Sequence, residues 1–161
     1  MARHDVIKIG YPGAVISCNH YLGRSSGGWT YVRPDAKAWM AELGWLIKRL
    51  HLEDWGLPLE VTCSGVFKDA RSCPDLSNLS KCTLDGIEEV TGINDRNMRW
   101  HDGTITISPK ETPYLLITIG ESTLETPPVA PQSKSRRSKV KVIANYVKRI
   151  YNSETHINKA D

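Results

Sequence analysis

Two short segments of the chain carry polar side chains that could do chemistry on a phosphate group. Asp75 precedes a predicted helix that carries Ser77, Asn78 and Lys81 on its polar side, in the stretch CPDLSNLSK. Asp95 follows this helix, in the stretch GINDRNM. Mg²⁺ is usually held by one or two carboxylates together with a substrate phosphate. Two acids and a lysine are therefore groups that suit metal-assisted phosphodiester cleavage.

The same side chains also have ordinary structural uses. Asp is a preferred residue for capping the first turn of a helix, so Asp75 alone could serve as an N-cap. Lys81 and Asp85 are four residues apart, which is the spacing of a common ion pair on a helix surface. Spacing by itself leaves the catalytic and the structural interpretations open.

The helix that begins near Asp75 is predicted to have an apolar face and a polar stripe. Residues of each kind recur every three or four positions, as the geometry of an α-helix requires. The apolar face consists of Leu76, Leu79, Thr83, Ile87 and Val90, and the polar stripe consists of Asn78, Lys81, Asp85 and Glu88. Gly92 is predicted to end the helix, so that the chain can turn back and bring Asp95 toward it.

The remaining segments predict an α/β (α+β) fold, with a small mixed β-sheet packed with two main helices. Apolar residues from Pro34 onward repeat with a period near 3.6, and Leu59, Val61 and Cys63 alternate as one face of a strand. The predicted elements are a strand at 6–9, a loop at 13–33, a helix at 34–52, a strand at 57–67, the helix at 76–90, a strand at 98–107 or a hairpin turning at 101–103, and a strand at 114–119.

Length and composition indicate one domain. The chain has 161 residues, enough to bury a core without disulfides, and its four cysteines form no C-x-x-C pair, so free thiols are expected. No stretch approaches the roughly 18 apolar residues of a membrane span. The N-terminus lacks the apolar region of a signal peptide. We therefore expect a cytoplasmic protein with no membrane partner.

The charge is unevenly distributed. Residues 1–125 form the predicted domain, and residues 126–161 a Pro/Ser-rich linker with a basic C-terminal tail. Residues 131–161 hold eight Lys or Arg and two acids, a balance of +6, whereas the other 130 residues have a balance of −3. Such a distribution suits a polyanion partner and is equally compatible with a solvated tail.

The segment DLSNLSKCTLDGIEEVTGINDRNM resembles the signature of the RusA family of Holliday junction resolvases. That signature is Asp-x-Asp-Asn-x-x-Lys-x-x-x-Asp, followed by a glycine and a pair of acids before a strand. The stretch IKIGYPGAVISCNHY resembles the family's opening strand, its Gly-x-Pro turn and the asparagine that follows. The resemblance spans residues 6–120 and implies a RusA-like fold, but it does not cover the tail beyond residue 125.

The resemblance implies roles for five polar residues. Asp75 matches the family's first metal-binding acid, Lys81 its catalytic lysine and Asp95 its last metal ligand. Asn78 matches the asparagine of the motif and Asn19 the asparagine near the N-terminus, both candidate contacts to DNA. The implied cofactor is Mg²⁺, with Mn²⁺ as a substitute.

Two positions depart from the family's pattern. Ser77 stands where the family has its second acid, and Asn94 stands where the first of the paired acids is usual. Ser77 could still be a metal ligand through its hydroxyl oxygen, but neither residue adds charge, and this should weaken cation binding. Asp69, Asp85 and Glu88 are the acids that could compensate.

By resemblance, the family's members are homodimers whose two active sites cut opposing strands of a four-way DNA junction. Arg71 and Arg96 are the leading basic contacts to the DNA, beside Asn19 and Asn78. Branched DNA is recognised by its shape and phosphate positions, so binding should weaken as salt is raised. Further basic candidates are Lys37, Lys48, Arg49, Lys68 and Arg99, and the tail adds others.

Three hypotheses remain at this point. The first is a Mg²⁺-dependent structure-specific endodeoxyribonuclease that resolves Holliday junctions in DNA recombination and repair, with Asp75, Lys81 and Asp95 at its active site. The second is a junction-binding protein with weak or lost nuclease activity, because Ser77 and Asn94 replace expected acids. The third is a small interaction domain without a DNA role, which predicts no salt-dependent binding to branched DNA.

Overall fold

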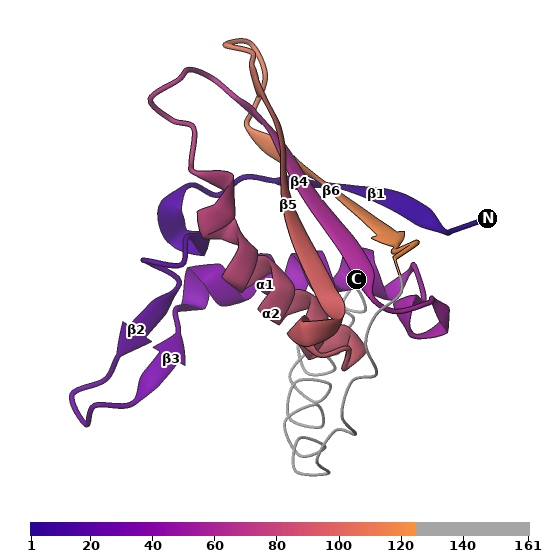
Figure 1. Cartoon of the computed structure of the whole chain (residues 1–161). Helices are drawn as coiled ribbons and strands as arrows, with labels where there is room; N and C mark the ends of the chain where they lie inside the picture. The colour runs from indigo at the N-terminus through magenta and orange to yellow at the C-terminus, as the bar shows by residue number, and fades with distance from the viewer. Residues whose placement is uncertain (125–161) are drawn as a thin grey trace, which may run out of the picture. The chain divides into compact units, whose positions relative to one another are not determined.

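A computed structural model describes residues 1–124 of the chain (Figure 1). The predicted linker and basic tail lie outside these described residues. The main elements are β1 His4–Gly10, β2 Leu22–Arg24, β3 Thr30–Val32, α1 Pro34–Lys48, β4 Leu59–Phe67, α2 Ser80–Thr91, β5 Met98–Ile107 and β6 Tyr114–Glu121. Short 3-10 turns lie at Ala14–Ile16, Leu52–Asp54, Leu76–Leu79 and Asp95–Asn97.

Four strands form one mixed sheet in the order β1-β6-β4-β5. β1 and β4 pair antiparallel with β6, whereas β5 pairs parallel with β4. Parallel neighbours need a long crossover, and the segment with α2 supplies it between β4 and β5. The predicted α+β class, a small mixed sheet with two main helices, is confirmed.

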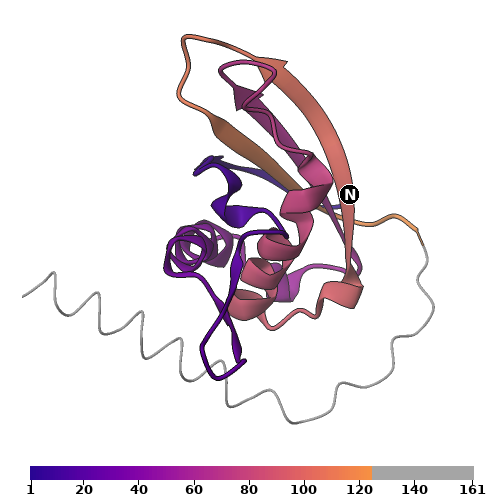
Figure 2. The same ribbon diagram turned by 90° about the vertical axis from the view of Figure 1, so that its left-hand side faces the viewer.

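The hydrophobic core lies between one face of the sheet and the two helices (Figures 1 and 2). Leu59, Val61 and Cys63 are fully buried, as their alternation predicts, and the residues between them are half-buried. Trp39 of α1 is also buried, and its indole Nε1 donates to the carbonyl of Gly10 at 2.9 Å. This bond ties α1 to the end of β1.

The two helices pack closely where each carries a glycine. A Cβ atom on Gly44 of α1 would lie 2.5 Å from Cγ2 of Val90, and one on Gly86 of α2 would lie 3.4 Å from Cδ2 of Leu43. Atoms of protein interiors are already close-packed, so the first distance leaves no room for a methyl group. Gly44 therefore allows the close approach of α1 and α2, whereas at Gly86 the contact is an ordinary one.

The structure decides between the two predictions for residues 98–107 in favour of a single strand. Asp102 pairs with Cys63, and the register with β4 shifts between Cys63 and Gly65. Gly103 lies at this bulge, where a Cβ atom would be 2.8 Å from the carbonyl oxygen of Cys63. The glycine thus permits a close approach of two strands and does not form a hairpin turn.

Two boundaries differ from prediction. The predicted loop at 13–33 contains the hairpin β2–β3, whose strands pair Leu22 with Val32 and Arg24 with Thr30. α1 ends at Lys48 and not near residue 52, and His51 then takes a left-handed conformation with φ of 52°. Strands of three residues are too short to show a period, which is why the hairpin gave no signal.

The second predicted helix starts as a 3-10 turn at Leu76–Leu79 and continues as α2. Gly92 ends it with φ of 73°, which confirms the predicted stop. All four cysteines are free thiols, as expected. Within residues 1–124, no helix has the length and apolar character needed to cross a bilayer.

Candidate functional site

Lys81 lies between two carboxylates on the polar stripe of α2. Its Nζ donates to Oδ1 of Asp85 at 2.6 Å and to Oδ2 of Asp95 at 3.4 Å. The lysine side chain is half exposed, and both acids are partly buried. Lys81, Asp85, Glu88 and Asp95 are called the lysine–acid cluster below.

Local structure brings Asp95 back to the helix. Gly92 ends α2, and Asn94 then caps the next 3-10 turn by accepting from the backbone N–H of Arg96 at 3.2 Å. The amide Nδ2 of Asn94 also donates to Oε1 of Glu88 at 3.3 Å. The two contacts of Asn94 hold the turn against α2, and Asp95 begins that turn.

Hydrogen bonds and charge fix the protonation of the cluster's two donors. The hydroxyl of the buried Tyr21 donates to Oδ2 of Asp85 at 3.2 Å. Burial and the Asp85 carboxylate raise the pKa of Tyr21 to about 12. The hydrogen bond to Asp85, with the charges of Asp85 and Asp95, raises the pKa of Lys81. Lys81 is therefore a cation and Tyr21 a neutral donor at neutral pH.

Three acids of this cluster could hold a metal ion. One carboxylate oxygen from each of Asp85, Glu88 and Asp95 lies within 4.8 Å of the other two. Ligands on opposite sides of Mg²⁺ or Ca²⁺ are about 4–5 Å apart, so small shifts would let the three oxygens share one ion. Three carboxylates also outnumber the single ammonium of Lys81. The donor set fits a hard divalent cation.

Asp75 lies outside this group of three acids. Its Oδ1 accepts from the backbone N–H of Ser77 at 3.2 Å and from the Ser77 hydroxyl at 2.8 Å. Asp75 is thus the N-cap of the turn that leads into α2. The prediction that Asp75, Ser77 and Asp95 bind one ion stays a prediction.

Asp69, the other predicted compensating acid, also has a structural contact. Its Oδ1 accepts from the backbone N–H groups of Arg71 and Ser72, both at 2.9 Å. Asp69 thereby closes the loop between β4 and the turn that precedes α2. Of the acids predicted to compensate, Asp85 and Glu88 lie in the cluster and Asp69 does not.

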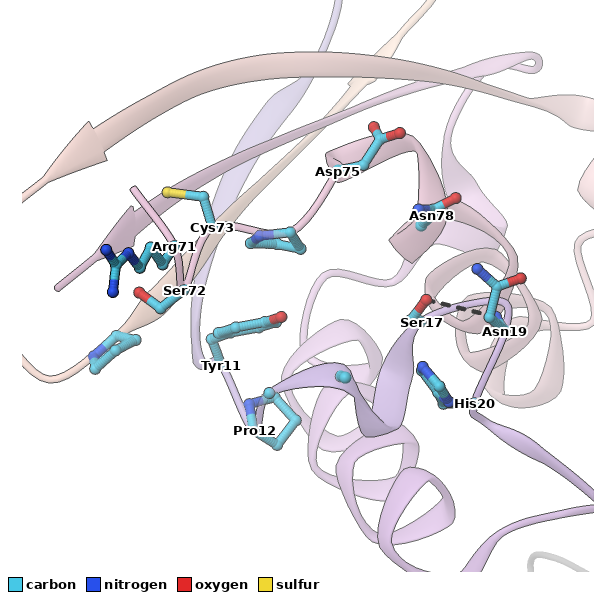
Figure 3. Close-up of a pocket in the computed structure, with 14 residues that line it drawn as sticks. Tyr11, Pro12, Ser17, Asn19, His20, Arg71, Ser72, Cys73, Asp75 and Asn78 are labelled. Carbon is cyan, nitrogen blue, oxygen red and sulfur yellow. Dashed lines mark hydrogen bonds between the residues drawn. The ribbon is translucent and has the colours of Figure 1, made fainter. Parts of the chain in front are cut away.

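Asp75 instead lines a cavity of about 730 Å³ beside the start of α2 (Figure 3). Its wall includes Tyr11, Asn19, His20, Arg71, Asp75 and Asn78. We call it the amide-lined cavity, because the side-chain amides of Asn19 and Asn78 line it. Asn19 lies in the segment after β1, and Asn78 lies in the turn before α2. Three of the predicted DNA contacts, Asn19, Arg71 and Asn78, therefore meet here, whereas Arg96 lies on the turn after α2.

Cys18 joins the two segments that carry the cavity's amides. Its backbone N–H donates to the carbonyl of Asn78 at 2.7 Å, and its Sγ lies 3.4 Å from Oδ1 of Asn78. Its Sγ also lies 3.7 Å from Oδ1 of Asn19. These contacts hold the turn after β1 against the start of α2.

Sequence reasoning missed Tyr21, which contacts the cluster from 64 positions away. Tyr21 lies in a Gly/Ser-rich region that was predicted to be a loop, and no regular spacing connects it to Asp85. The one available signal is a large aromatic residue close to Asn19, which is too weak to assign a contact. Tertiary packing alone reveals it.

Comparisons with known proteins add little. No family model matches the chain, and no curated protein does. Among solved structures, a similar chain is "IspF (Plasmodium falciparum) CDP complex", with 13% identity and a TM-score of 0.32. The match covers 52% of this chain and 53% of that chain, so about half of each is compared. A similarity at this level carries no argument about function.

Proposed function

We propose that this chain is a Mg²⁺-dependent endodeoxyribonuclease that cuts branched DNA as a crossover junction resolvase. The observation that carries the proposal is the placement of Lys81 against Asp85 and Asp95 within a cluster of acids that could hold a metal ion. These residues belong to the segment that resembles the RusA signature. The resemblance supplies the substrate class, and the cluster supplies groups suited to phosphodiester chemistry.

The charge of the cluster supports a hard cation as the cofactor. Asp85, Glu88 and Asp95 offer carboxylate oxygens, which are the ligands that Mg²⁺ and Mn²⁺ prefer. A bound divalent ion would supply charge stabilisation at the phosphate and lower the pKa of a bound water. In the proposed site Asp95 is a metal ligand, which is also the role that the resemblance gives it. Asp85 and Glu88 compensate for the acids missing at Ser77 and Asn94.

The chain's own residues have separate tasks in this proposal. Lys81 places a permanent positive charge where a scissile phosphate would gain negative charge. Asp85 orients the Lys81 ammonium, and Tyr21 in turn fixes the Asp85 carboxylate through its hydroxyl. Asp75 holds the first turn in place, so that Lys81 projects from a defined helix start.

The amide-lined cavity is the proposed contact for the DNA backbone next to the cut. Arg71 and His20 are exposed at its rim, and the side chains of Asn19 and Asn78 offer uncharged donors and acceptors. A basic residue beside neutral amides suits one phosphate with its sugar. A homodimer would present two such sites to the opposing strands of a four-way junction.

One observation favours the alternative, a junction-binding protein that does not cut. At both positions where the resemblance expects an acid, the neutral residue is hydrogen-bonded to another acid: Ser77 to Asp75 and Asn94 to Glu88. These bonds occupy oxygens that a metal would otherwise use. The alternative therefore predicts that the protein binds the junction tightly and leaves it uncut.

Cleavage of a synthetic four-way junction tests the proposal. The wild-type chain is expected to cut it with Mg²⁺ or Mn²⁺ and to leave it intact with a chelator. Binding is measured in parallel without metal. Tight, salt-sensitive binding with no cleavage under any metal condition would replace the proposal by the alternative.

The variant Ser77→Asp separates the two functions further. Under the alternative it should gain cleavage, because it restores a carboxylate beside Asp75. If the wild type is fully active and Ser77→Asp is no faster, the acids at Asp85 and Glu88 are sufficient. If the wild type binds no branched DNA at all, both functions are wrong.

A further inference from the structure

The hairpin β2–β3 projects from the body of the domain (Figures 1 and 2). Two of the aromatic side chains in this segment are exposed. Trp29 is 77% exposed and Tyr31 is 48% exposed. Large aromatic residues are usually much more buried, so two on one small element need an explanation. Residues 22–33 are called the aromatic hairpin below.

Each of the two rings lies next to a glycine, and hydrogen bonds between Ser25 and Trp29 close the turn. A Cβ atom on Gly23 would lie 2.7 Å from Cζ of Tyr31, so this ring lies directly across the glycine. A Cβ atom on Gly27 would lie 3.3 Å from Cδ1 of Trp29. Ser25 closes the turn, because its N–H donates to the Trp29 carbonyl at 2.9 Å and its Oγ accepts from the Trp29 N–H at 3.1 Å. The turn thus places Trp29 and Tyr31 at the end of the hairpin, with the Tyr31 ring across Gly23.

The register of the hairpin puts both rings on the face that begins at Tyr21. Tyr31 pairs with Gly23, and the Arg33 N–H donates to the Tyr21 carbonyl at 2.8 Å, which extends the ladder toward the domain. Alternate residues of a strand share a face, so Trp29 and Tyr31 share the face of Tyr21. Tyr21 contacts Asp85 of the lysine–acid cluster. The strand face that carries Tyr31 thus leads, at the base of the hairpin, to the residue that contacts the cluster.

The composition of the aromatic hairpin indicates a negatively charged binding partner that also carries planar aromatic groups. Arg24 and Arg33 are exposed, and no acid occurs between residues 22 and 33. Exposed aromatic rings next to arginines are the usual platform for unpaired nucleobases, because the rings stack on the bases and the cations contact the phosphates. A partner protein with an apolar surface would not need the positive charge.

We propose that the aromatic hairpin stacks on unpaired nucleobases at the branch point of the DNA, with Trp29 and Tyr31 as the stacking residues. This inference rests on the proposed function for its DNA substrate. It adds a specific preference, since base pairs at a branch point unstack and open more easily than base pairs inside an intact duplex. The hairpin would hold the branch point next to Lys81 and the acids.

Binding of two DNA probes tests this role. The first is a four-way junction with unpaired thymines at its centre, and the second is a paired duplex of equal length. The variants are Trp29→Ala, Tyr31→Ala and the double change, with Trp45→Ala as the matched control. Trp45 is a suitable control because it is 49% exposed on α1, outside the hairpin.

Each hairpin variant is expected to weaken binding to the junction at least about fivefold, which corresponds to the loss of one stacked base. Duplex binding should change less than twofold for the same variants, and Trp29→Phe should retain most of the affinity for the junction. Trp45→Ala should leave both affinities unchanged. Far-UV circular dichroism and the thermal midpoint should stay near wild type, because both rings are exposed.

The outcomes separate this inference from the proposed function. If the wild type cleaves the junction and all variants bind it equally well, the inferred role of the hairpin is wrong and the proposed nuclease function stands. Hairpin-dependent binding without cleavage supports the hairpin and rejects the nuclease. No DNA binding by the wild type rejects both. A loss of self-association with unchanged DNA affinity would make the hairpin an interface between copies of the chain and would overturn the inference.

Discussion

The lysine–acid cluster and the amide-lined cavity lie at the same helix but differ in how their acids are used. In the cluster, Asp85 and Asp95 face a lysine, and together with Glu88 they form a group that could take a further cation. In the cavity, Asp75 accepts two hydrogen bonds from Ser77. Asp75 and Asp95 are the two acids to which the resemblance gives a metal-binding role, but of these two only Asp95 belongs to the group of three acids.

The difference shows that a motif can keep its order in sequence while its parts take separate tasks. Ser77 supplies a hydroxyl donor where the resemblance expects a carboxylate, and this donor satisfies Asp75. The charge that the motif loses at Ser77 is available from Glu88, which lies on the polar stripe of α2. We infer that chemistry belongs to the cluster and positioning to the cavity, and four measurements can break this division.

The largest expected effect is that of Lys81→Met on cleavage. Loss of one positioned group that stabilises charge in the transition state typically lowers turnover by about 10²–10³-fold. Lys110→Met is the matched control, because Lys110 lies on the loop before β6 and outside both the cluster and the cavity. Cleavage of a four-way junction under single-turnover conditions measures both. Equal activity of the two variants would remove Lys81 from the chemistry.

The next largest expected effect is on metal affinity. It is measured for one acid of the lysine–acid cluster and one acid of the amide-lined cavity. Asp95→Asn should weaken Mn²⁺ binding at least about tenfold, because it removes a charged oxygen ligand. Asp75→Asn should change it less than twofold if the division is correct. Titration of Mn²⁺ followed by electron paramagnetic resonance gives both values without any need for activity. A larger loss with Asp75→Asn would return Asp75 to the metal site.

Tyr21→Phe should lower stability by about 1.5 kcal/mol at neutral pH, since it removes a partly buried hydrogen bond to a carboxylate. The folded state raises the pKa of Tyr21 to about 12, above its usual value near 10. The contribution is therefore complete below pH 10 and is lost as the pH rises toward 12. Urea unfolding at pH 8 and pH 11.5 should show a smaller difference between variant and wild type at the higher pH.

The smallest effect concerns the cap at Asp75. Asp75→Ala should lower the free energy of unfolding by about 1 kcal/mol, because it leaves the N–H of Ser77 without its acceptor. Asp75→Asn is the control, since its amide oxygen can still cap the turn, and it should remain near wild type. Chemical denaturation distinguishes them. An equal loss with both variants would show that the charge of Asp75, and not its capping oxygen, stabilises the fold.

Much of the fold was accessible from the sequence because its longer elements carry clear periods. The alternation of Leu59, Val61 and Cys63 predicts the buried face of β4, and Gly92 predicts the end of α2. The hairpin β2–β3 was missed, because three-residue strands show no alternation. Residues 98–107 stayed ambiguous, because Asp102-Gly103 is a strong turn signal and the close approach that needs Gly103 depends on β4.

The candidate site was predictable only in its local part. The pair of Lys81 and Asp85 follows from helical spacing, and capping by Asp75 from residue preference. The contact of Tyr21 with Asp85 joins distant segments, and no local signal specifies it. The roles that the resemblance gives to Asp75 and Ser77 at the metal remain predictions.

The glycine contact between α1 and α2 has a consequence for how this sequence can vary. Gly44 and Gly86 touch neither the cluster nor the hairpin, yet α1 follows directly from the hairpin and α2 carries Lys81. A single methyl group added at Gly44 would displace Val90 and move one helix relative to the other. Related sequences should therefore keep a small residue at Gly44, and a larger residue there should be accompanied by a shift of α1 relative to α2.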